Sequence, residues 1–241
     1  MLNTKNGRAR FFRCHQNKRK FAREWTRKNA NILLLIYMYI PKHFAETDQE
    51  KLIEFMREFN FATLVTAEND LPFATHLPFM IEIRDDKVFL LAHLAKANPH
   101  WQQFSDKEVL VIFQEPHAYI SPLHYEKTEN VPTWNYIAVH AYGLLKTFPQ
   151  VENLKLLEKQ VEAFDKKYFE TNWQKISNDY KINLAKGVIA FEIEVTDLQG
   201  KKKLNQNKTG KDAQNVIEAF EKSDNDNEKI IAKYMKEVHQ Y

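Results

Sequence analysis

Apolar residues recur along this chain with two different spacings, and the changes of spacing define the expected elements. The first helical pattern follows Thr47-Asp48-Gln49-Glu50, which has the form of a capping box: Thr47 caps the helix and Glu50 reaches back. Five apolar residues then follow at helical spacing: Leu52, Ile53, Phe55, Met56 and Phe59. The spacing predicts an amphipathic helix over residues 48–59 that begins at a Thr47 cap.

Most other apolar segments are short and either alternate or run continuously, as strands do. The expected strands cover residues 61–66, 72–83, 87–93, 109–114, 118–121, 134–146 and 188–198. Pro78 interrupts the second strand, because proline has no N–H to donate to a ladder. Turn residues follow the first two strands, at Glu68-Asn69-Asp70 and at Asp85-Asp86.

Helical patterns are fewer. Asn98-Pro99 predicts the start of a short helix through residue 104, with Asn as the cap and Pro at the first position. Residues 150–169 carry one apolar stripe, and helices are expected near 212–221 and 228–239. Six or so strands with few crossover helices predict a mostly β, antiparallel barrel with peripheral helices.

Charge divides the chain near residue 37. Residues 1–37 hold ten Lys/Arg and one acid, Glu24, a net +9; the rest holds 25 Lys/Arg and 31 Asp/Glu, a net −6, and the two give the total of +3. The apolar run at 32–40 is far shorter than the ~20 residues that span a bilayer. The basic segment has three interpretations. It could be a signal peptide, although no small-residue cleavage site follows the apolar run, or it could be a nucleic-acid-binding arm. We favour the third, a disordered extension before a true start at Met38.

The expected organisation is therefore a basic, disordered extension over 1–37, a barrel domain over 38–200, and a polar loop with helices over 201–241 that packs on the barrel. Cys14 is the only cysteine, which excludes an internal disulfide and four-thiolate metal sites and favours a reducing, cytoplasmic location. With five glycines and no G-x-G-x-x-G or P-loop, a glycine-rich phosphate loop is excluded as well.

Histidines are the first candidate chemistry. Four of them lie in or beside expected strands: His76, His93, His117 and His140. They could form a metal site or could each make one structural hydrogen bond. No pair has helical ligand spacing and no carboxylate accompanies them, so we favour structural roles and expect no metal.

Three further segments carry alternatives that the residues leave open. Lys96 beside the helix start at Asn98 could form a phosphate cradle with free amides, or could be a solvated lysine beside an ordinary cap. Trp134 and Tyr136 share a strand face and could flank a flat ring or pack in the core. The lysine-rich segment 201–208 could grip phosphate or nucleic acid, or could be a solvated loop.

Seven segments, in this order, resemble the PaiB family, the FMN-binding negative transcriptional regulators. They are residues 38–44, 61–65, 75–78, 93–99, 116–122 (PHAYISP), 131–136 (VPTWNY), and Lys203-Leu204 with Gln206-Asn207. The PHAYISP and VPTWNY runs are the most specific, and together the matches span about residues 38–210.

The resemblance implies an FMN-binding split β-barrel in which two subunits pair and the flavin lies in the groove between them. It also implies negative control of transcription, in the best-known relatives over sporulation and secreted protease genes. The resemblance also implies the cofactor-binding residues by position. His93, Lys96 and Asn98 would lie at the flavin phosphate and ribityl chain, with His76 on the neighbouring strand. The groove would be closed, in one arrangement from the partner subunit, by Trp134, Asn135, Lys203 and Gln206.

Other functions of such a fold stay open: flavin-dependent oxidoreductase activity, and haem binding or degradation. Any DNA binding is expected to be weak and carried by residues 1–37, or regulation to be indirect, because the body is acidic. The chain also departs from the family, whose C-terminal motif usually reads Lys-Trp-Lys-Leu-Ser-Gln-Asn-Arg. Five positions differ from the usual residue: Lys96 (Arg), His124 (Trp), Lys202 (Trp), Asn205 (Ser) and Lys208 (Arg).

Overall fold

The computed structural model describes residues 38–104 and 108–239. The chain divides into two units, Met1–Tyr39 and Ile40–Tyr241, and the fold described below is that of the second unit. The basic segment 1–37, with Cys14 and the three interpretations attached to it, lies outside the described residues.

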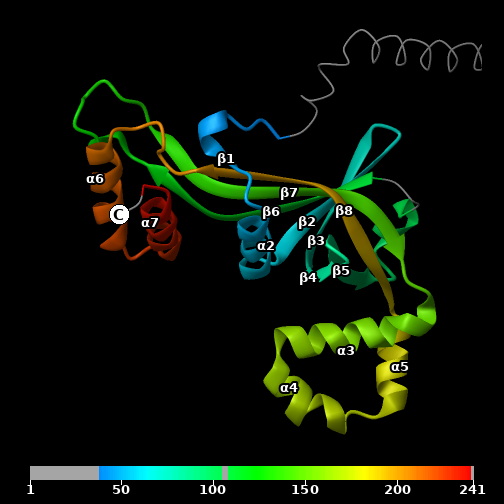
Figure 1. Ribbon diagram of the computed structural model, residues 1–241. Coiled ribbons are helices and arrows are strands. Elements are labelled where there is room, and N and C mark those ends of the chain that lie inside the picture. Colours follow the sequence, from blue (N-terminus) through cyan, green and yellow to red (C-terminus); the bar gives the residue numbers. More distant parts are fainter. Residues whose placement is uncertain (1–37, 105–107, 240–241) are drawn as a thin grey trace, which may run out of the picture. The chain divides into compact units, whose positions relative to one another are not determined.

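One antiparallel sheet organises the second unit (Figure 1). Its strands are β1 (Ala45–Glu46), β2 (Phe61–Glu68), β3 (Leu71–Pro78), β4 (Met80–Arg84), β5 (Lys87–Ala95), β6 (Glu108–Ile120), β7 (Thr133–Thr147) and β8 (Val188–Lys203). The hydrogen-bonded order is β3-β2-β6-β7-β8-β5-β4, and β1 pairs with β8. Among these described strands no ladder joins β3 to β4, so the sheet is an incompletely closed barrel. The expected mostly β, antiparallel fold with peripheral helices is confirmed.

Two strands differ in length from the sequence expectation. β6 runs without a break through 114–118, where two strands were expected, because a register shift between Gln114 and His117 accommodates Pro116 inside the ladder. β8 continues to Lys203, so Lys201–Lys203, assigned to the C-terminal loop from their charge, pair with β7 instead. Pro78 does end β3, and Phe79 separates it from β4.

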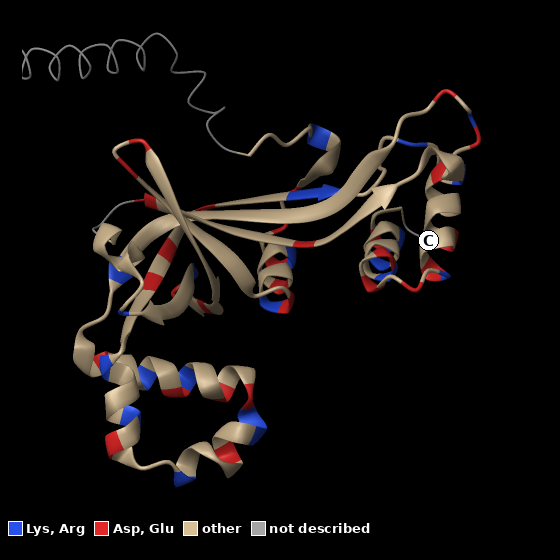
Figure 2. Ribbon diagram, turned by 180° about the vertical axis from the view of Figure 1, so that it is seen from behind, with Lys and Arg blue, Asp and Glu red and all other residues tan. Residues whose placement is uncertain are grey.

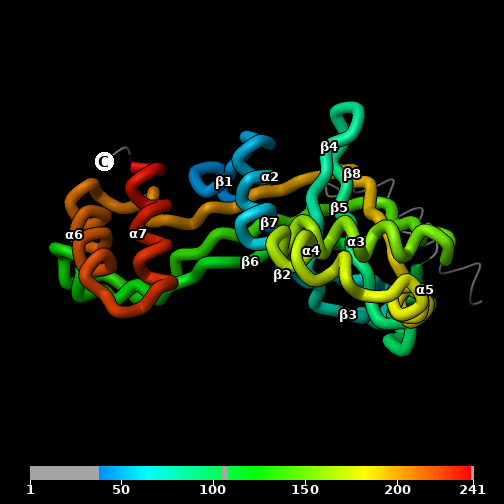
Figure 3. Tube along the Cα trace, turned by 90° about the horizontal axis from the view of Figure 1, so that it is seen from below, coloured from blue at the N-terminus to red at the C-terminus, as the bar shows by residue number. Residues whose placement is uncertain are grey.

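In the part of the chain that the structure describes, six α-helices flank the sheet: α2 (Gln49–Glu58), α3 (Asn153–Phe164), α4 (Lys166–Thr171), α5 (Asn178–Lys186), α6 (Gly210–Glu221) and α7 (Asp226–His239). Asp48, not Thr47, caps α2: its carboxylate accepts from the N–H groups of Glu50 and Lys51. The single helix expected over 150–169 is broken at Asp165, whose side chain caps α4. Figures 1 and 3 show α3–α5 at one end of the long strands and α6–α7 at the other.

The inner face of the sheet forms the core. Buried side chains along it include Leu64, Val111, Phe113, Ile137 and Ile193, none more than 2% exposed. α2 and α7 cover this face, where the apolar side of each helix joins the same core cluster (Figure 1). None of the helices in the described ranges is long and apolar enough to cross a membrane.

The other side of the sheet, which we call the outer face, is half-exposed. Direct cross-strand partners define two rows on it, because opposed residues of an antiparallel pair project to the same side. One row is His76, Thr63, Ile112, His140 and Gln199; the next is Ala74, Val65, Leu110, Tyr142 and Asp197. This face runs on along β7 through Tyr136 to Trp134, since alternate residues of a strand share a side.

Candidate functional site

Lys96 lies in the turn that ends β5, and its side chain is exposed. The backbone of this turn is fixed: the Lys96 N–H donates to the Gly187 carbonyl at 2.8 Å, and the Lys96 carbonyl accepts from Trp101 Nε1 at 2.9 Å. The backbone of the turn is thus fixed by hydrogen bonds while the Lys96 ammonium group is exposed, an arrangement suited to binding an anion such as a phosphate.

Asn98 caps the short 3-10 helix η3 (Pro99–Gln103), as the sequence predicts. The start of η3 does not offer the free amides that the sequence suggested, however. Pro99 has no N–H, and the His100 N–H already donates to Asn98 Oδ1 at 3.0 Å. Asn98 Nδ2 donates in turn to Thr75 Oγ1 at 3.2 Å, so this side chain ties the turn to β3.

His93 and His76 point away from that turn. His93 Nδ1 lies 2.5 Å from Gln160 Oε1 of α3, on the side of β5 that the helix covers. His76 is exposed on the outer face of β3, whereas its neighbour Thr75 projects to the opposite side. In one chain, therefore, only Lys96 and Asn98 of the four residues expected around the phosphate lie in the same turn.

A second group of expected residues lies at the other end of the sheet. Trp134 on β7 is 52% exposed and contacts Tyr119 of β6 edge-on, with ring centroids 5.8 Å apart. The His117 ring lies 5.9 Å from the Trp134 ring. Tyr136 is on the same side, opposite His117 and Lys203 in register. We call this set (His117, Tyr119, Trp134, Tyr136) the aromatic platform.

Two lysines border the platform on β8. Lys201 Nζ lies 5.3 Å from the centre of the Tyr136 ring. Lys203 Nζ donates to the Trp134 carbonyl at 2.8 Å and to the Thr133 hydroxyl. Burial, reinforced by the charge of Lys201, lowers the pKa of Lys203. The platform thus combines exposed aromatic surface with cationic donors, a combination that suits flat, electron-rich or anionic ligands.

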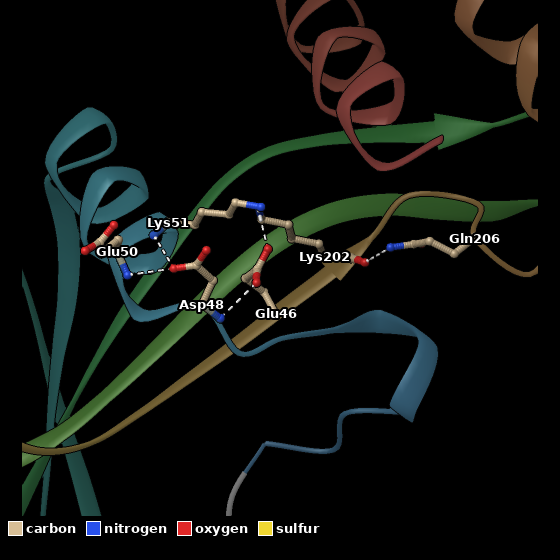
Figure 4. Close-up of polar contacts among 6 residues, drawn as sticks. All are labelled: Glu46, Asp48, Glu50, Lys51, Lys202 and Gln206. Atoms are coloured by element: carbon tan, nitrogen blue, oxygen red, sulfur yellow. Dashed lines mark hydrogen bonds and ion pairs between the residues drawn. The ribbon is translucent and has the colours of Figure 1, made fainter. Parts of the chain in front are cut away.

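Asn135 and Gln206 do not face the platform. Asn135 is fully buried on the inner face, where its Nδ2 contacts Met235 Sδ at 3.4 Å and its Oδ1 has no hydrogen-bond partner. Gln206 folds back on its own turn: Oε1 accepts from the Leu204 N–H and Nε2 donates to the Lys202 carbonyl (Figure 4). Asn135 therefore joins β7 to α7, and Gln206 holds the turn after β8.

Three departures from the family motif also lie away from the platform. Lys202 is buried opposite Ile137 on the inner face and pairs with Glu46 at 3.0 Å (Figure 4). Asn205 has a positive φ of 63°, a conformation that asparagine tolerates better than most residues. Lys208 Nζ donates to Asn130 Oδ1 at 2.6 Å and lies over the Tyr125 ring.

The two groups are far apart within one chain. His93 pairs with Ala190 near the start of β8, and Lys203, which pairs with Tyr136, follows thirteen residues later on the same strand. At about 3.3 Å per residue this is roughly 43 Å of strand. A flavin mononucleotide, one three-ring system with a five-carbon chain and one phosphate, is much shorter.

The four strand histidines are not gathered either. Over residues 38–104 and 108–239, no group of three or more His, Cys, Asp or Glu side chains is placed to hold a metal ion. His140 is on the outer face with its Nδ1 buried and unpartnered, and burial lowers its pKa. On the helices of the described residues, basic and acidic residues alternate and form no long basic stripe (Figure 2).

Sequence reasoning missed the polar contacts of His100. This side chain is fully buried and hydrogen-bonds Thr66 and Thr75 through its two ring nitrogens. Its partners are 34 and 25 residues away, so only the pairing of β2 with β3 brings them together. Tyr119 was missed as a platform residue, although its alternation with Ala118 and Ile120 indicates an exposed position.

Comparison with known proteins adds a family and a fold. The family described as "Putative FMN-binding domain" matches residues 38–197. "Protease synthase and sporulation protein PAI 2" of Bacillus subtilis (strain 168) is 41% identical over 202 residues, covering 83% of this chain and 97% of that protein. "Uncharacterized protein AN0679" of Emericella nidulans is 30% identical over 245 residues, with the same coverage of both chains.

Two solved structures share the fold at low identity. The FAD and haem binding protein from Mycobacterium smegmatis superposes with a TM-score of 0.51 at 13% identity, covering 66% of this chain and 73% of that one. The flavocytochrome Anf3 from Azotobacter vinelandii also gives 0.51 at 13%, covering 68% and 72%. At this identity the likeness shows the split-barrel fold alone.

Proposed function

The chain belongs to the PaiB family of FMN-binding split-barrel proteins, and we propose that it is a negative regulator of transcription that holds FMN between two copies of itself. FMN is its cofactor. One observation supports a flavin site shared between two copies: within one chain, Lys96 and the aromatic platform lie near opposite ends of β8, too far apart to bind the same FMN.

The donor set of the two groups fits the parts of FMN. Lys96 offers a fixed positive charge for the phosphate, as a point charge where the family usually has the bidentate arginine. Trp134 and Tyr119 offer ring faces to the isoalloxazine, and Lys203 offers its third N–H to a carbonyl oxygen, since the other two are directed at Trp134 and Thr133. When bound, FMN supplies redox chemistry; the residues of this chain bind and orient it.

The outer face supports pairing of two copies. Its central rows combine apolar side chains (Val65, Leu110, Ile112) with polar ones and are half-exposed, unlike the fully buried inner face. In the proposed dimer a two-fold related copy lies on this face, with the Lys96 turn of one chain next to the platform of the other. Such an interface buries the same patch of both subunits, as two-fold dimers do.

Complementation between two defective variants tests the shared site. Lys96→Ala and Trp134→Ala are each expected to weaken FMN binding about tenfold or more, read as loss of flavin fluorescence quenching. The two variants are then unfolded, mixed and refolded together. Each mixed dimer should contain one intact site and one site with both substitutions, so it should bind one FMN per dimer. Lys222→Ala, on the exposed end of α6, is the matched control.

Mass measurement completes the test: the wild-type protein is expected to sediment as a dimer. A monomer that binds FMN, or a mixture that regains nothing although each variant is folded, would refute a site built from two copies. A flat FMN titration of the wild-type dimer would refute the platform as a flavin surface.

The regulatory part of the proposal rests on the family and on charge. The body carries −6 and residues 1–37 carry +9, so we expect any DNA binding to be weak, salt-sensitive and independent of sequence. Deleting the gene should raise the transcripts that the protein represses, and Lys96→Ala should fail to restore repression if flavin is the signal. If Lys96→Ala restores repression, regulation does not depend on FMN binding and this part of the proposal is refuted.

A further inference from the structure

The buried histidine at position 100 makes two hydrogen bonds through its ring. Nε2 lies 2.8 Å from Thr66 Oγ1 on β2, and Nδ1 lies 2.7 Å from Thr75 Oγ1 on β3. The ring also stacks on Phe73, with centroids 4.4 Å apart. The side chain therefore joins η3 to both strands of the β2–β3 hairpin.

The partners fix the direction of each bond. Thr66 donates its hydroxyl hydrogen to Gln103 Oε1 at 2.5 Å, so its oxygen accepts from His100 Nε2–H. A neutral imidazole has one N–H, so Nδ1 is an acceptor and Thr75 donates to it. Burial lowers the pKa of His100, in agreement with a neutral ring.

The chain of bonds continues to the Lys96 turn. Thr75 Oγ1 accepts from Asn98 Nδ2, and Asn98 Oδ1 accepts from the His100 backbone N–H. The Asn98 backbone N–H donates to the Ala95 carbonyl at 2.8 Å and closes the turn around Lys96. Every link has a donor facing an acceptor, so the turn has one preferred position against β3.

We propose that His100 is a positioning residue for FMN: through Thr75 and Asn98 it holds the turn that presents Lys96 to the flavin phosphate. This rests on the proposed FMN site and on Lys96 as its phosphate contact. His100 does not touch the flavin, because it is fully buried. It acts through the Thr75 branch of its bonds, whereas the Thr66 branch leads only to Gln103 and the interior.

Two substitutions separate the branches. The Asn side-chain oxygen can take the place of Nδ1 and keep the Thr75 bond, so His100→Asn retains the link to Asn98. The Gln amide reaches the place of Nε2 and keeps the Thr66 bond, so His100→Gln leaves Thr75 without its acceptor. Both remove the Phe73 stack and one hydrogen bond, so both should lower the melting temperature by a similar amount.

Binding of FMN and of riboflavin, which lacks the phosphate, is measured below the melting transition of each variant. His100→Gln should weaken FMN binding roughly tenfold, the effect of losing about one hydrogen bond's free energy, and leave riboflavin binding unchanged. His100→Asn should stay within about twofold of wild type for both ligands. Thr75→Val, which removes the same link from the other side, should copy His100→Gln.

Controls distinguish this inference from the function it rests on. If the wild type binds neither ligand, the proposed function fails. If Lys96→Ala weakens FMN but not riboflavin binding, while His100→Asn and His100→Gln bind FMN equally, the function stands and the positioning role is refuted. Equal weakening of both ligands by His100→Gln would also refute it, because a general loss of structure does not select the phosphate.

Discussion

The ion pair between Glu46 and Lys202 joins the end of β1, next to the start of α2, to strand β8. Their charged atoms lie 3.0 Å apart, and the side chains are only 17% and 11% exposed (Figure 4). Glu46 also accepts from the Asp48 N–H at 3.0 Å, next to the first turn of α2. Substituting Lys202 by Met keeps the length of the side chain and leaves the carboxylate without its cation.

The expected magnitude lies between that of surface and fully buried pairs. Exposed pairs contribute about 0–1 kcal/mol, and removing one partner of a buried pair costs about 3–5 kcal/mol. Glu46 keeps its backbone hydrogen bond and some water contact, so Lys202→Met should cost about 2–3 kcal/mol. In a domain of this size that lowers the melting temperature by roughly 4–12 °C. The double variant with Glu46→Gln should recover about half of the loss.

The pH dependence follows from the carboxylate. Burial alone would raise the pKa of Glu46, but the Asp48 N–H and the Lys202 ammonium outweigh it and lower the pKa below its ordinary 4.5. The pair therefore stabilises the fold fully above that ordinary value, and its contribution is lost as the pH falls through the lower folded value. In Lys202→Met this acid-dependent loss should be smaller, because the lowering of the Glu46 pKa by Lys202 is gone and only the burial effect, the Asp48 N–H and the charge of Lys51 remain.

Urea unfolding of the four proteins of the double-mutant cycle, at pH 7 and in steps down to pH 3, gives the coupling energy directly. A matched cycle on Lys229 and Asp226 of α7, an exposed pair 3.9 Å apart, should give a coupling near zero. Strictly additive losses at Glu46 and Lys202, or equal pH profiles of wild type and Lys202→Met, would refute the reasoning.

Three further substitutions test the packing. Gly200→Ala places a Cβ 2.2 Å from Leu52 Cδ2 of α2 and should cost about 1–3 kcal/mol in urea unfolding; an unchanged midpoint would contradict the close approach. Asn153→Ala removes the side-chain donor to the Val188 carbonyl and one of two donors to the Ala185 carbonyl, which keeps Gln150, and should cost about 1–3 kcal/mol; a neutral result would mean that water replaces the amide. Ile112→Asp, in the middle of the outer face, should shift the sedimenting mass from dimer to monomer with little change in the fold; a persistent dimer would place the interface elsewhere.

Local patterns predicted most elements, and the exceptions have local physical causes. The capping box pointed to Thr47, yet the neighbouring Asp48 caps α2, because two adjacent cap residues compete for the same amides. Asp165 broke the expected long helix by capping a second one, although the apolar stripe continues through it. The run Lys201–Lys203 was assigned to a loop from its charge, but pairing with β7 decides its structure.

The candidate site was less predictable, because its contacts join distant segments. Lys96 and Trp134 are exposed, and Lys203 is half-buried beside Trp134. His93 meets Gln160, which is 67 residues away on a helix that sequence reasoning had not placed against β5. Nothing local in the sequence indicates that a helix covers one histidine and leaves His76 exposed.

Strand alternation along β8 explains how this chain departs from its family motif without altering the platform. Lys201 and Lys203 face outward with Tyr136, while Lys202 between them faces inward beside Tyr234. A tryptophan at position 202 would lie against α2 and α7, not against the proposed flavin. Lys202 replaces that apolar contact with an ion pair to Glu46. The substitution therefore changes how the helices attach to the sheet, and the proposed flavin surface depends on the neighbouring residues that the motif retains.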